Sequence, residues 1–231
     1  MKKIKLTLLC SMAAAVLLPF VAQADFAYNI GAVSLYKSKG VDQNTVDATD
    51  FHPAIQGSVD WTHASGFYVS NWNSTGKFGA ANLEIDLQAG FARKLTDSIS
   101  YDIGFLTYTY PDEASWNATE LRASVSLGAF KLYYGNVVAK AAEGDQFYGV
   151  DYVRALNDKL TFGLGLGIKN PKNRNNLVNP DADKNNAYGN VSLAYDLGAG
   201  LVTKLDISGA NESVYGAAGK TRAVVSVNQS F

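Results

Sequence analysis

The last eleven residues, Thr221 to Phe231, alternate in polarity and end on an aromatic side chain. Successive side chains of a strand point to opposite sides, so this segment has one mostly apolar face and one mostly polar face. The mostly apolar face carries Thr221, Ala223, Val225, Val227, Gln229 and Phe231. A closing strand of this kind is typical of an outer-membrane β-barrel. A half-exposed strand in a soluble sheet can show the same alternation, so the ending needs support from the rest of the chain.

The first 24 residues have the plan of a secretory signal peptide. Lys2, Lys3 and Lys5 precede an apolar run over residues 6–21, and Ala22-Gln23-Ala24 supplies the small residues of a cleavage site. This order directs export, and the apolar run is too short for a membrane-spanning helix. We expect cleavage after Ala24. Residues 1–24 would then be removed, and residues 25–231 would form one outer-membrane barrel domain.

Composition argues against several kinds of chemistry in the mature chain. The single cysteine, Cys10, lies within the signal, so we expect no disulfide, thiolate nucleophile or cysteine metal site. His52 and His63 are too few and too scattered for a histidine metal site. Loss of the three signal lysines takes the formal net charge from −1 to −4, which argues against a nucleic-acid-binding face. We therefore expect no cofactor, no metal and no nucleic-acid partner.

The mature chain contains about twelve segments whose polarity alternates with period 2. In one of them, Leu83, Ile85 and Leu87 alternate with the charged or polar residues between them. This pattern predicts strands with two different faces. The expected strands cover residues 26–36, 54–63, 66–75, 82–94, 98–110, 118–128, 130–140, 146–156, 159–169, 186–196, 200–209 and 220–231.

The predicted connections alternate between short and long. Short turns are expected at 64–65, 95–97, 129, 157–158 and 197–199, and longer polar loops at 37–53, 76–81, 111–117, 141–145, 170–185 and 210–219. A bacterial outer-membrane barrel has short periplasmic turns, longer external loops and an even number of strands. The sequence thus predicts an all-β fold, a transmembrane antiparallel up-and-down β-barrel of about 12 strands in the outer membrane of a Gram-negative bacterium.

Two stretches near the start of the mature chain resemble a known family. Residues 53–74 read PAIQGSVDWTHASGFYVSNWNS and residues 36–43 read YKSKGVDQ, which is similar to the opening of the TorF-like porin family. The resemblance covers roughly residues 26–112 and implies an outer-membrane barrel. It departs from the family in the first loop, where Ser38-Lys39 replaces an aromatic-Arg pair and Asp42 replaces a Ser.

Charged residues fall on the faces expected to line the lumen. If the apolar face of each strand meets lipid, the pore-lining charges are Asp60, Glu84, Asp86, Asp102, Glu120, Arg122, Lys131, Asp151, Lys204, Asp206 and Arg222. This set holds more acids than bases, and acidic side chains in a pore favour cations. We therefore predict a weak cation preference. The alternative is that acids and bases pair across a narrow lumen and partly fill it.

Two smaller groups of residues have competing interpretations. Asp60, Glu84 and Asp86 lie on the second and fourth strands, where they form either a cation site or a hydrogen-bonded network with Arg122. His63 and Ser65 flank a short turn, and a His-Ser pair is one requirement of a lipid hydrolase. A turn-forming Ser-Gly beside a polar histidine is the interpretation that we favour.

The function predicted from the sequence is a porin-like channel for passive diffusion of small hydrophilic solutes or ions, with no enzymatic activity. One alternative is a non-conducting barrel whose loops 37–53 and 170–185 bind a partner. A second is an outer-membrane lipid hydrolase that uses His63 and Ser65. The expected partners are outer-membrane lipid, the transported solutes or ions, and the barrel-assembly machinery, which would read the strand ending at Phe231. We expect a monomer.

Overall fold

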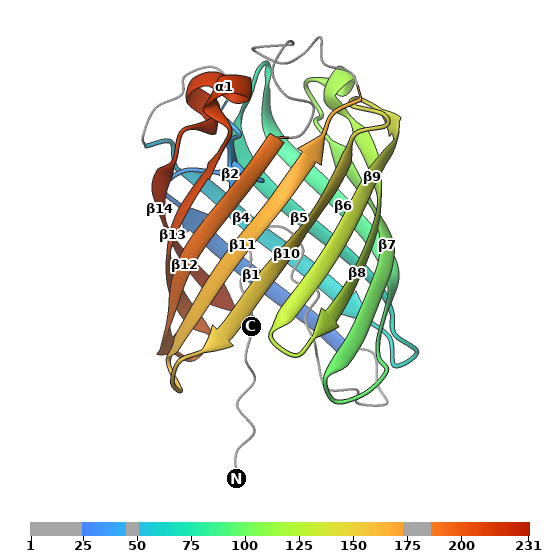
Figure 1. Cartoon of the computed structure of the whole chain (residues 1–231), viewed down its shortest axis with the longest axis vertical. Coiled ribbons are helices and arrows are strands. Elements are labelled where there is room, and N and C mark those ends of the chain that lie inside the picture. The colour runs from blue at the N-terminus through green and yellow to red at the C-terminus, as the bar shows by residue number, and fades with distance from the viewer. Residues whose placement is uncertain (1–24, 45–50, 173–185) are drawn as a thin grey trace.

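A computed structural model describes residues 25–44, 51–172 and 186–231, and in them twelve long strands form one closed barrel (Figure 1). The long strands are β1 (Asp25–Val33), β4 (Ala54–Thr62), β5 (Phe67–Phe78), β6 (Ala81–Lys94), β7 (Ile99–Thr109), β8 (Ala118–Leu127), β9 (Phe130–Lys140), β10 (Gln146–Ala155), β11 (Leu160–Asn170), β12 (Asn186–Gly198), β13 (Leu201–Ala210) and β14 (Arg222–Ser230). The short elements are β2 (Lys37–Ser38), β3 (Val41–Asp42), η1 (Ala114–Trp116), α1 (Glu212–Tyr215) and η2 (Gly216–Gly219). None of the helices in these residues is long and apolar enough to span a membrane.

Each long strand pairs antiparallel with its neighbours, and β1 closes the barrel by pairing with both β4 and β14. The β1–β4 register runs from Asp25 opposite Thr62 to Val33 opposite Ala54, and Val33 also lies opposite Ser226 of β14. The twelve-stranded up-and-down barrel predicted from the sequence is confirmed. The predicted signal peptide, residues 1–24, lies outside the described residues, as do 45–50 and 173–185 within the two predicted partner-binding loops.

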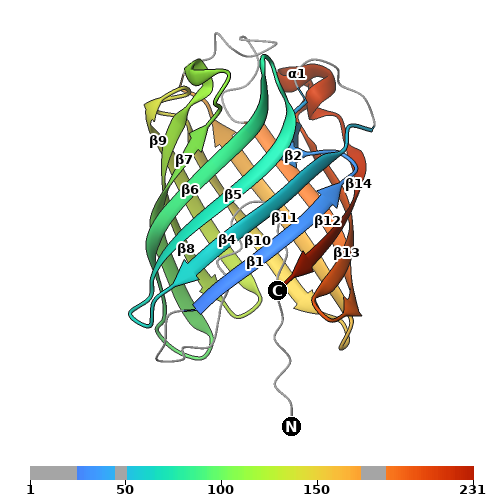
Figure 2. The same cartoon turned by 180° about the vertical axis from the view of Figure 1, so that it is seen from behind.

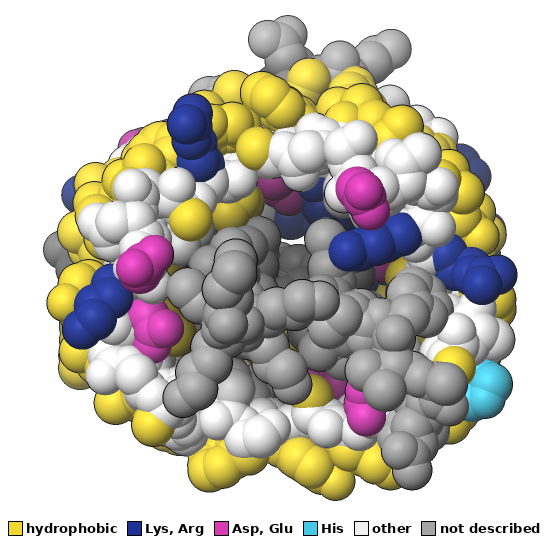
Figure 3. Space-filling view, turned by 90° about the horizontal axis from the view of Figure 1, so that it is seen from below, with side chains coloured by type: hydrophobic (Ala, Val, Ile, Leu, Met, Phe, Trp, Pro, Cys, Tyr) yellow, Lys and Arg dark blue, Asp and Glu magenta, His cyan; other side chains and the backbone are white. Residues whose placement is uncertain are grey.

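Alternation along each strand separates an apolar exterior from a polar interior. On β8, Leu121 and Val125 are 52% and 40% exposed on the outside, whereas Glu120 of the same strand is only 4% exposed. Figure 3 shows the barrel from one end, with hydrophobic side chains around much of the perimeter, charged side chains on the rim and a few acidic and basic side chains in the visible opening. In water such an apolar perimeter would be unfavourable, but lipid tails would cover it.

Both ends of the described chain lie at the end of the barrel that carries the short turns, at the bottom of Figures 1 and 2. We call this the short-turn end, and the opposite one the long-loop end. The helices α1 and η1 lie at the long-loop end, as part of the connections that follow β13 and β7.

Two predicted boundaries were wrong, both at the long-loop end. The first strand ends at Val33 rather than at residue 36, because Leu35 and Tyr36 turn into the barrel, where they are 1% and 5% exposed. The predicted loop 76–81 is instead a tight hairpin in which β5 and β6 extend to Phe78 and Ala81. Gly79, with φ of +63°, allows this turn, and burial of Phe78 holds it in place.

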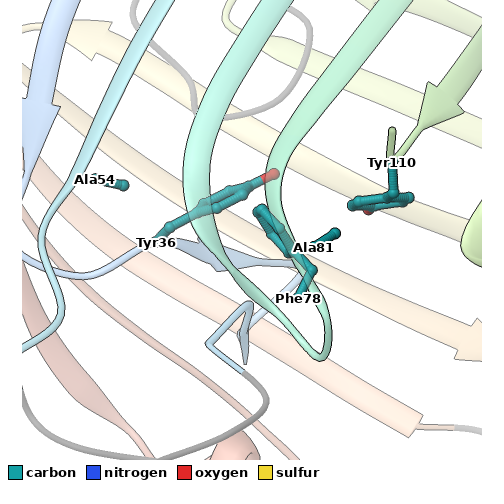
Figure 4. Close-up of a cluster of buried hydrophobic side chains, with 5 residues drawn as sticks. All are labelled: Tyr36, Ala54, Phe78, Ala81 and Tyr110. Atoms are coloured by element: carbon teal, nitrogen blue, oxygen red, sulfur yellow. The ribbon is translucent and has the colours of Figure 1, made fainter. Parts of the chain in front are cut away.

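Buried aromatic side chains join these two features. Tyr36, Ala54, Phe78, Ala81 and Tyr110 form a cluster, drawn in Figure 4. The ring of Phe78 lies 6.1 Å from that of Tyr36 and 5.2 Å from that of Tyr110. Each such pair stabilises a structure by about 0.5–1.5 kcal/mol beyond its area burial. The cluster therefore fastens the segment after β1 to the wall formed by β4–β7.

Candidate functional site: the lumen and its inward hairpin

The connection between β1 and β4 begins with a hairpin that lies inside the barrel. Its strands β2 and β3 pair Lys37 with Asp42 and Ser38 with Val41. The two turn residues, Lys39 and Gly40, have φ of +48° and +73°, as a two-residue hairpin turn of type I′ requires. A Cβ on Gly40 would lie 2.2 Å from the carbonyl oxygen of Gly209, so only glycine permits this close approach to β13. We call residues 34–44 the inward hairpin.

A buried ionic cluster holds the base of the inward hairpin against the last strand. Asp42 Oδ1 lies 2.7 Å from Lys37 Nζ, and Asp42 Oδ2 lies 2.6 Å from Arg222 Nη1. Lys37 Nζ also donates to the carbonyl oxygen of Lys220 at 3.0 Å, and Arg222 Nη1 to that of Ala217 at 2.9 Å. Burial lowers the pKa of Lys37, and its hydrogen bond to Asp42 opposes that shift.

The tip of the inward hairpin reaches a different part of the wall. Lys39 Nζ lies 4.0 Å from the ring centre of Phe147 on β10 and 3.9 Å from Oε2 of Glu120 on β8. The Lys39 side chain is 22% exposed, against 5% for that of Glu120. Burial lowers the pKa of Lys39, and the negative charge of Glu120 opposes the shift.

Glu120 also has a hydrogen-bond partner and an ionic partner on the strands of the barrel wall. Its Oε2 accepts a hydrogen bond from the hydroxyl of Tyr108 at 2.9 Å, and its Oε1 lies 3.6 Å from Nε of Arg122. Arg122 Nη1 donates to Gln88 Oε1 at 3.1 Å. A Cβ on Gly135 would lie 2.4 Å from Glu120 Oε1, so the glycine leaves the space that this carboxylate occupies. Lys39 thus meets a carboxylate that has other partners.

The hairpin tip borders a polar cavity, whose empty space, including the part open to solvent, is about 1110 Å³. Its polar lining includes the tyrosine pair Tyr133 and Tyr188, whose hydroxyl oxygens are 2.9 Å apart. Five basic and four acidic side chains line it: Lys37, Lys39, Arg122, Lys131 and Lys204, with Asp102, Glu120, Asp151 and Asp206. Charges of both signs are therefore interspersed along the lining of the cavity.

Most of the predicted pore-lining residues border this cavity. Those that do are Asp102, Glu120, Arg122, Lys131, Asp151, Lys204 and Asp206. The others face the interior but have different neighbours. Asp60 accepts hydrogen bonds from Ser58 and Ser70, Glu84 and Asp86 are 2% and 4% exposed, and Arg222 binds Asp42.

The structure does not join Asp60 to Glu84 and Asp86. Glu84 Oε1 accepts a hydrogen bond from the hydroxyl of Tyr110 at 2.8 Å, at the aromatic cluster, whereas the partners of Asp60 are serines. Across the described ranges, no group of three or more His, Cys, Asp or Glu residues is arranged to hold a metal ion. Arg122 contacts Glu120 and Gln88, so the predicted network is centred on Glu120 instead.

Sequence reasoning missed Lys37 and Lys39, because residues 37–53 were predicted to form an external loop. The two sequence features of this hairpin are the apolar pair Leu35-Tyr36 just before the predicted loop, and a Lys-Gly turn flanked by short strand residues. Neither feature distinguishes a hairpin inside a wet lumen from one outside it.

His63 and Ser65 lie close together in an exposed turn. His63 Nδ1 lies 2.8 Å from Ser65 Oγ and also accepts a hydrogen bond from the backbone N–H of Ser65 at 3.2 Å. The Ser65 hydroxyl accepts from the N–H of Phe67 at 3.4 Å. These contacts, two residues apart, are those of a side chain that stabilises a tight turn.

Comparison with known proteins places the chain in a family. Residues 21–221 match the model of a family described as bacterial proteins of unknown function, Gcw_chp. The chain belongs to this family. No curated protein matches it. The likeness of this Gcw_chp chain to solved structures is in fold.

Several solved structures with a similar fold are porins, and one is another outer-membrane protein. The KdgM porin superposes with a TM-score of 0.62 at 14% identity, over 89% of this chain and 99% of that one. The NanC porin gives 0.55 at 13% identity, over 90% and 99%. The outer-membrane protein Omp33 of Acinetobacter baumannii gives 0.50 at 10% identity, over 91% and 98%. This Gcw_chp chain therefore has the barrel fold of outer-membrane porins.

Proposed function

We propose that this protein is a porin-like channel of the bacterial outer membrane, through which small hydrophilic solutes or ions diffuse passively. The observation that carries the proposal is a closed barrel with an apolar perimeter around a charged, solvent-accessible cavity. A closed barrel satisfies every backbone group in lipid, and a lumen lined by side chains of both signs can replace part of the hydration of a polar solute.

The proposal extends to how the chain reaches its membrane. A signal peptide cleaved after Ala24 would export it, and the closing strand that ends at Phe231 would be read by the barrel-assembly machinery. Phe231 is 76% exposed and donates its N–H to the carbonyl oxygen of Tyr28, next to the seam between β14 and β1. We also propose that the chain is related to the TorF-like porins. We propose that it is a monomer.

The weak cation preference predicted from the sequence stays a proposal, and the charges around the cavity do not support it. Among the residues that border the cavity, bases slightly outnumber acids once Lys37 and Lys39 are included. The acids Glu84 and Asp86, which contributed to the predicted excess, are buried at the wall. Any selectivity between ions is therefore expected to be small.

A non-conducting barrel whose loops bind a partner is the second candidate. The observation in its favour is the inward hairpin, which contacts β14 at its base and β13, β8 and β10 at its turn. A hairpin in this position occupies part of the lumen. A lipid hydrolase that uses His63 and Ser65 is the remaining alternative, and the turn contacts of that pair lend it no support.

Single-channel recording separates the first two candidates. The mature chain, refolded in detergent, would be added to a planar lipid bilayer under a salt gradient, with heat-dependent gel migration as the check that the barrel has folded. Discrete current steps support the channel, and their reversal potential gives the ion preference. A bilayer that stays silent with folded protein would contradict the channel and favour the partner-binding barrel.

A further inference from the structure

We propose that the side chain of Lys39, at the tip of the inward hairpin, sets the width and the charge selectivity of the passage. This inference rests on the channel function proposed above and assigns a specificity-determining residue within it. It follows from where the hairpin is attached, from how the Lys39 backbone is held, and from what the Lys39 side chain contacts.

The inward hairpin is attached to the wall on several sides. Its base joins Arg222 of β14 through Asp42, and its turn touches β13 at Gly209. On another side, Tyr36 packs 5.6 Å from the ring of Trp72 on β5. The tip then meets β8 and β10 through Lys39. A segment with contacts on these separate parts of a closed barrel lies across the lumen, so a solute has to pass it.

The backbone at the tip has little freedom to move aside. Lys39 and Gly40 have positive φ in a two-residue turn, and Gly40 lies directly against the backbone of β13. The ion pairs of Asp42 fix the two strands that carry the turn. The part of the hairpin that can yield to a passing solute is therefore the flexible side chain of Lys39.

The contacts of that side chain are easily exchanged. Its Nζ is 3.9 Å from Glu120 Oε2, a carboxylate oxygen that also accepts from Tyr108, and its other contact is the ring face of Phe147. It is also the more exposed member of its ion pair. A solute anion could replace Glu120 as its partner, while a cation has to pass close to an unmoved positive charge. Charge at such a point acts strongly because low-dielectric walls focus the field.

Three substitutions at Lys39 test this inference, with two controls that make the same charge change elsewhere. Lys39→Glu reverses the charge, Lys39→Met removes it at similar length, and Lys39→Gly removes the side chain while keeping a residue suited to positive φ. Lys204→Glu changes a lysine that borders the same cavity, and Lys94→Glu changes an exposed lysine at the short-turn end. All five variants would be checked by heat-dependent migration and recorded in planar bilayers under a salt gradient.

We expect Lys39→Glu to raise the ratio of cation to anion permeability by at least about twofold, which is less than a unit charge a few ångströms away would give even in bulk water. The increase should exceed that of Lys204→Glu, and Lys94→Glu should change little. Lys39→Met should give an intermediate ratio, and Lys39→Gly a larger single-channel conductance.

If the wild type conducts and Lys39→Glu shifts the permeability ratio no more than Lys204→Glu does, the inference about Lys39 is overturned. The channel function then still stands. If the folded wild type is silent, the channel function fails. In that case, current through Lys39→Gly would still support Lys39 as the residue that closes the passage, and silence from Lys39→Gly as well would overturn it.

Discussion

Arg222 Nη1 lies 2.6 Å from Asp42 Oδ2, a contact that ties the first residue of the last strand to a hairpin between the first two long strands. The Asp42 side chain is fully buried and that of Arg222 is 6% exposed. Because Asp42 also pairs with Lys37, one carboxylate balances two buried cations. The ionic contacts at the base of the inward hairpin therefore depend on a single acidic residue.

Replacement of Asp42 by Ala is expected to destabilise the protein and to release the inward hairpin. Removing one partner of a buried ion pair typically costs about 3–5 kcal/mol, because the remaining charges are left buried and unpaired. The measurement is the midpoint of heat- or denaturant-induced unfolding in detergent. The readout is the loss of heat-dependent gel migration. Asp112→Ala, at an exposed position of the connection after β7, is the control and should leave the midpoint unchanged. Equal midpoints for the two variants would contradict the assigned role.

The charge on Lys39 should make the ion preference depend on pH. Burial lowers the pKa of Lys39 from its ordinary value of 10.5, so its positive charge is lost at a lower pH than that of a solvated lysine. The charged groups acting on it are Glu120, Arg122, Lys169 and Asp86. We expect the reversal potential of the wild type to move toward cation preference as the pH rises. The phenols of Tyr36 and Tyr110 have pKa values raised by burial, so they stay neutral over the range.

The matched control for this titration is Lys39→Met, which should lack the alkaline step. Lys37 also has a pKa lowered by burial and remains in that variant, so any change it causes appears in both proteins. An identical pH profile for wild type and Lys39→Met would show that another group is responsible.

A methyl group at Gly167 is expected to narrow the lumen. A Cβ there would lie 2.3 Å from Cζ of Tyr188 and 2.5 Å from the hydroxyl of Tyr133, so both rings have to shift inward from the wall. Overpacking of this kind typically costs about 1–3 kcal/mol in stability. We expect Gly167→Ala to lower single-channel conductance and the unfolding midpoint together. Leu166→Ala, on the neighbouring outward-facing residue, should keep the wild-type conductance.

Replacement of His63 by Ala tests the hydrolase alternative. If the His63–Ser65 contact only stabilises a turn, His63→Ala should change stability by less than about 1 kcal/mol, in the range of a single exposed hydrogen bond. Release of fatty acid from phospholipid vesicles should be at background for both wild type and variant. Wild-type hydrolysis that disappears in His63→Ala would establish the enzyme and contradict the function proposed above.

Deletion of Phe231 should impair assembly in cells more than folding in detergent. Its side chain is 76% exposed, so its loss removes little packing from the folded barrel. We expect fewer folded barrels in the outer-membrane fraction and a nearly normal yield of refolded protein in vitro. Phe26→Ala, which removes another exposed aromatic side chain on β1, is the control. Equal losses in cells for both variants would argue against a terminal assembly signal.

Most of the barrel could be predicted from the sequence because the pattern that specifies it is local. Segments such as 82–94 and 130–140 alternate apolar and polar residues, and in the structure these are β6 (Ala81–Lys94) and β9 (Phe130–Lys140). With period 2, one face of each strand meets lipid and the other meets the lumen, so the strand positions and the interior charges follow together. Errors occurred where a strand reaches beyond the apolar band, as in β5 and β6 at Phe78 and Ala81.

The sequence by itself determined the twelve strands and the alternation of their two faces. Only the tertiary structure decided that residues 34–44 turn into the barrel, which brings Asp42 to Arg222, 180 residues away, and places Lys39 against Phe147 and Glu120. The physical reason is that alternating polarity is a local signal, whereas the position of a connecting segment depends on which distant residues bury it. Contacts between distant parts of the chain therefore select its place.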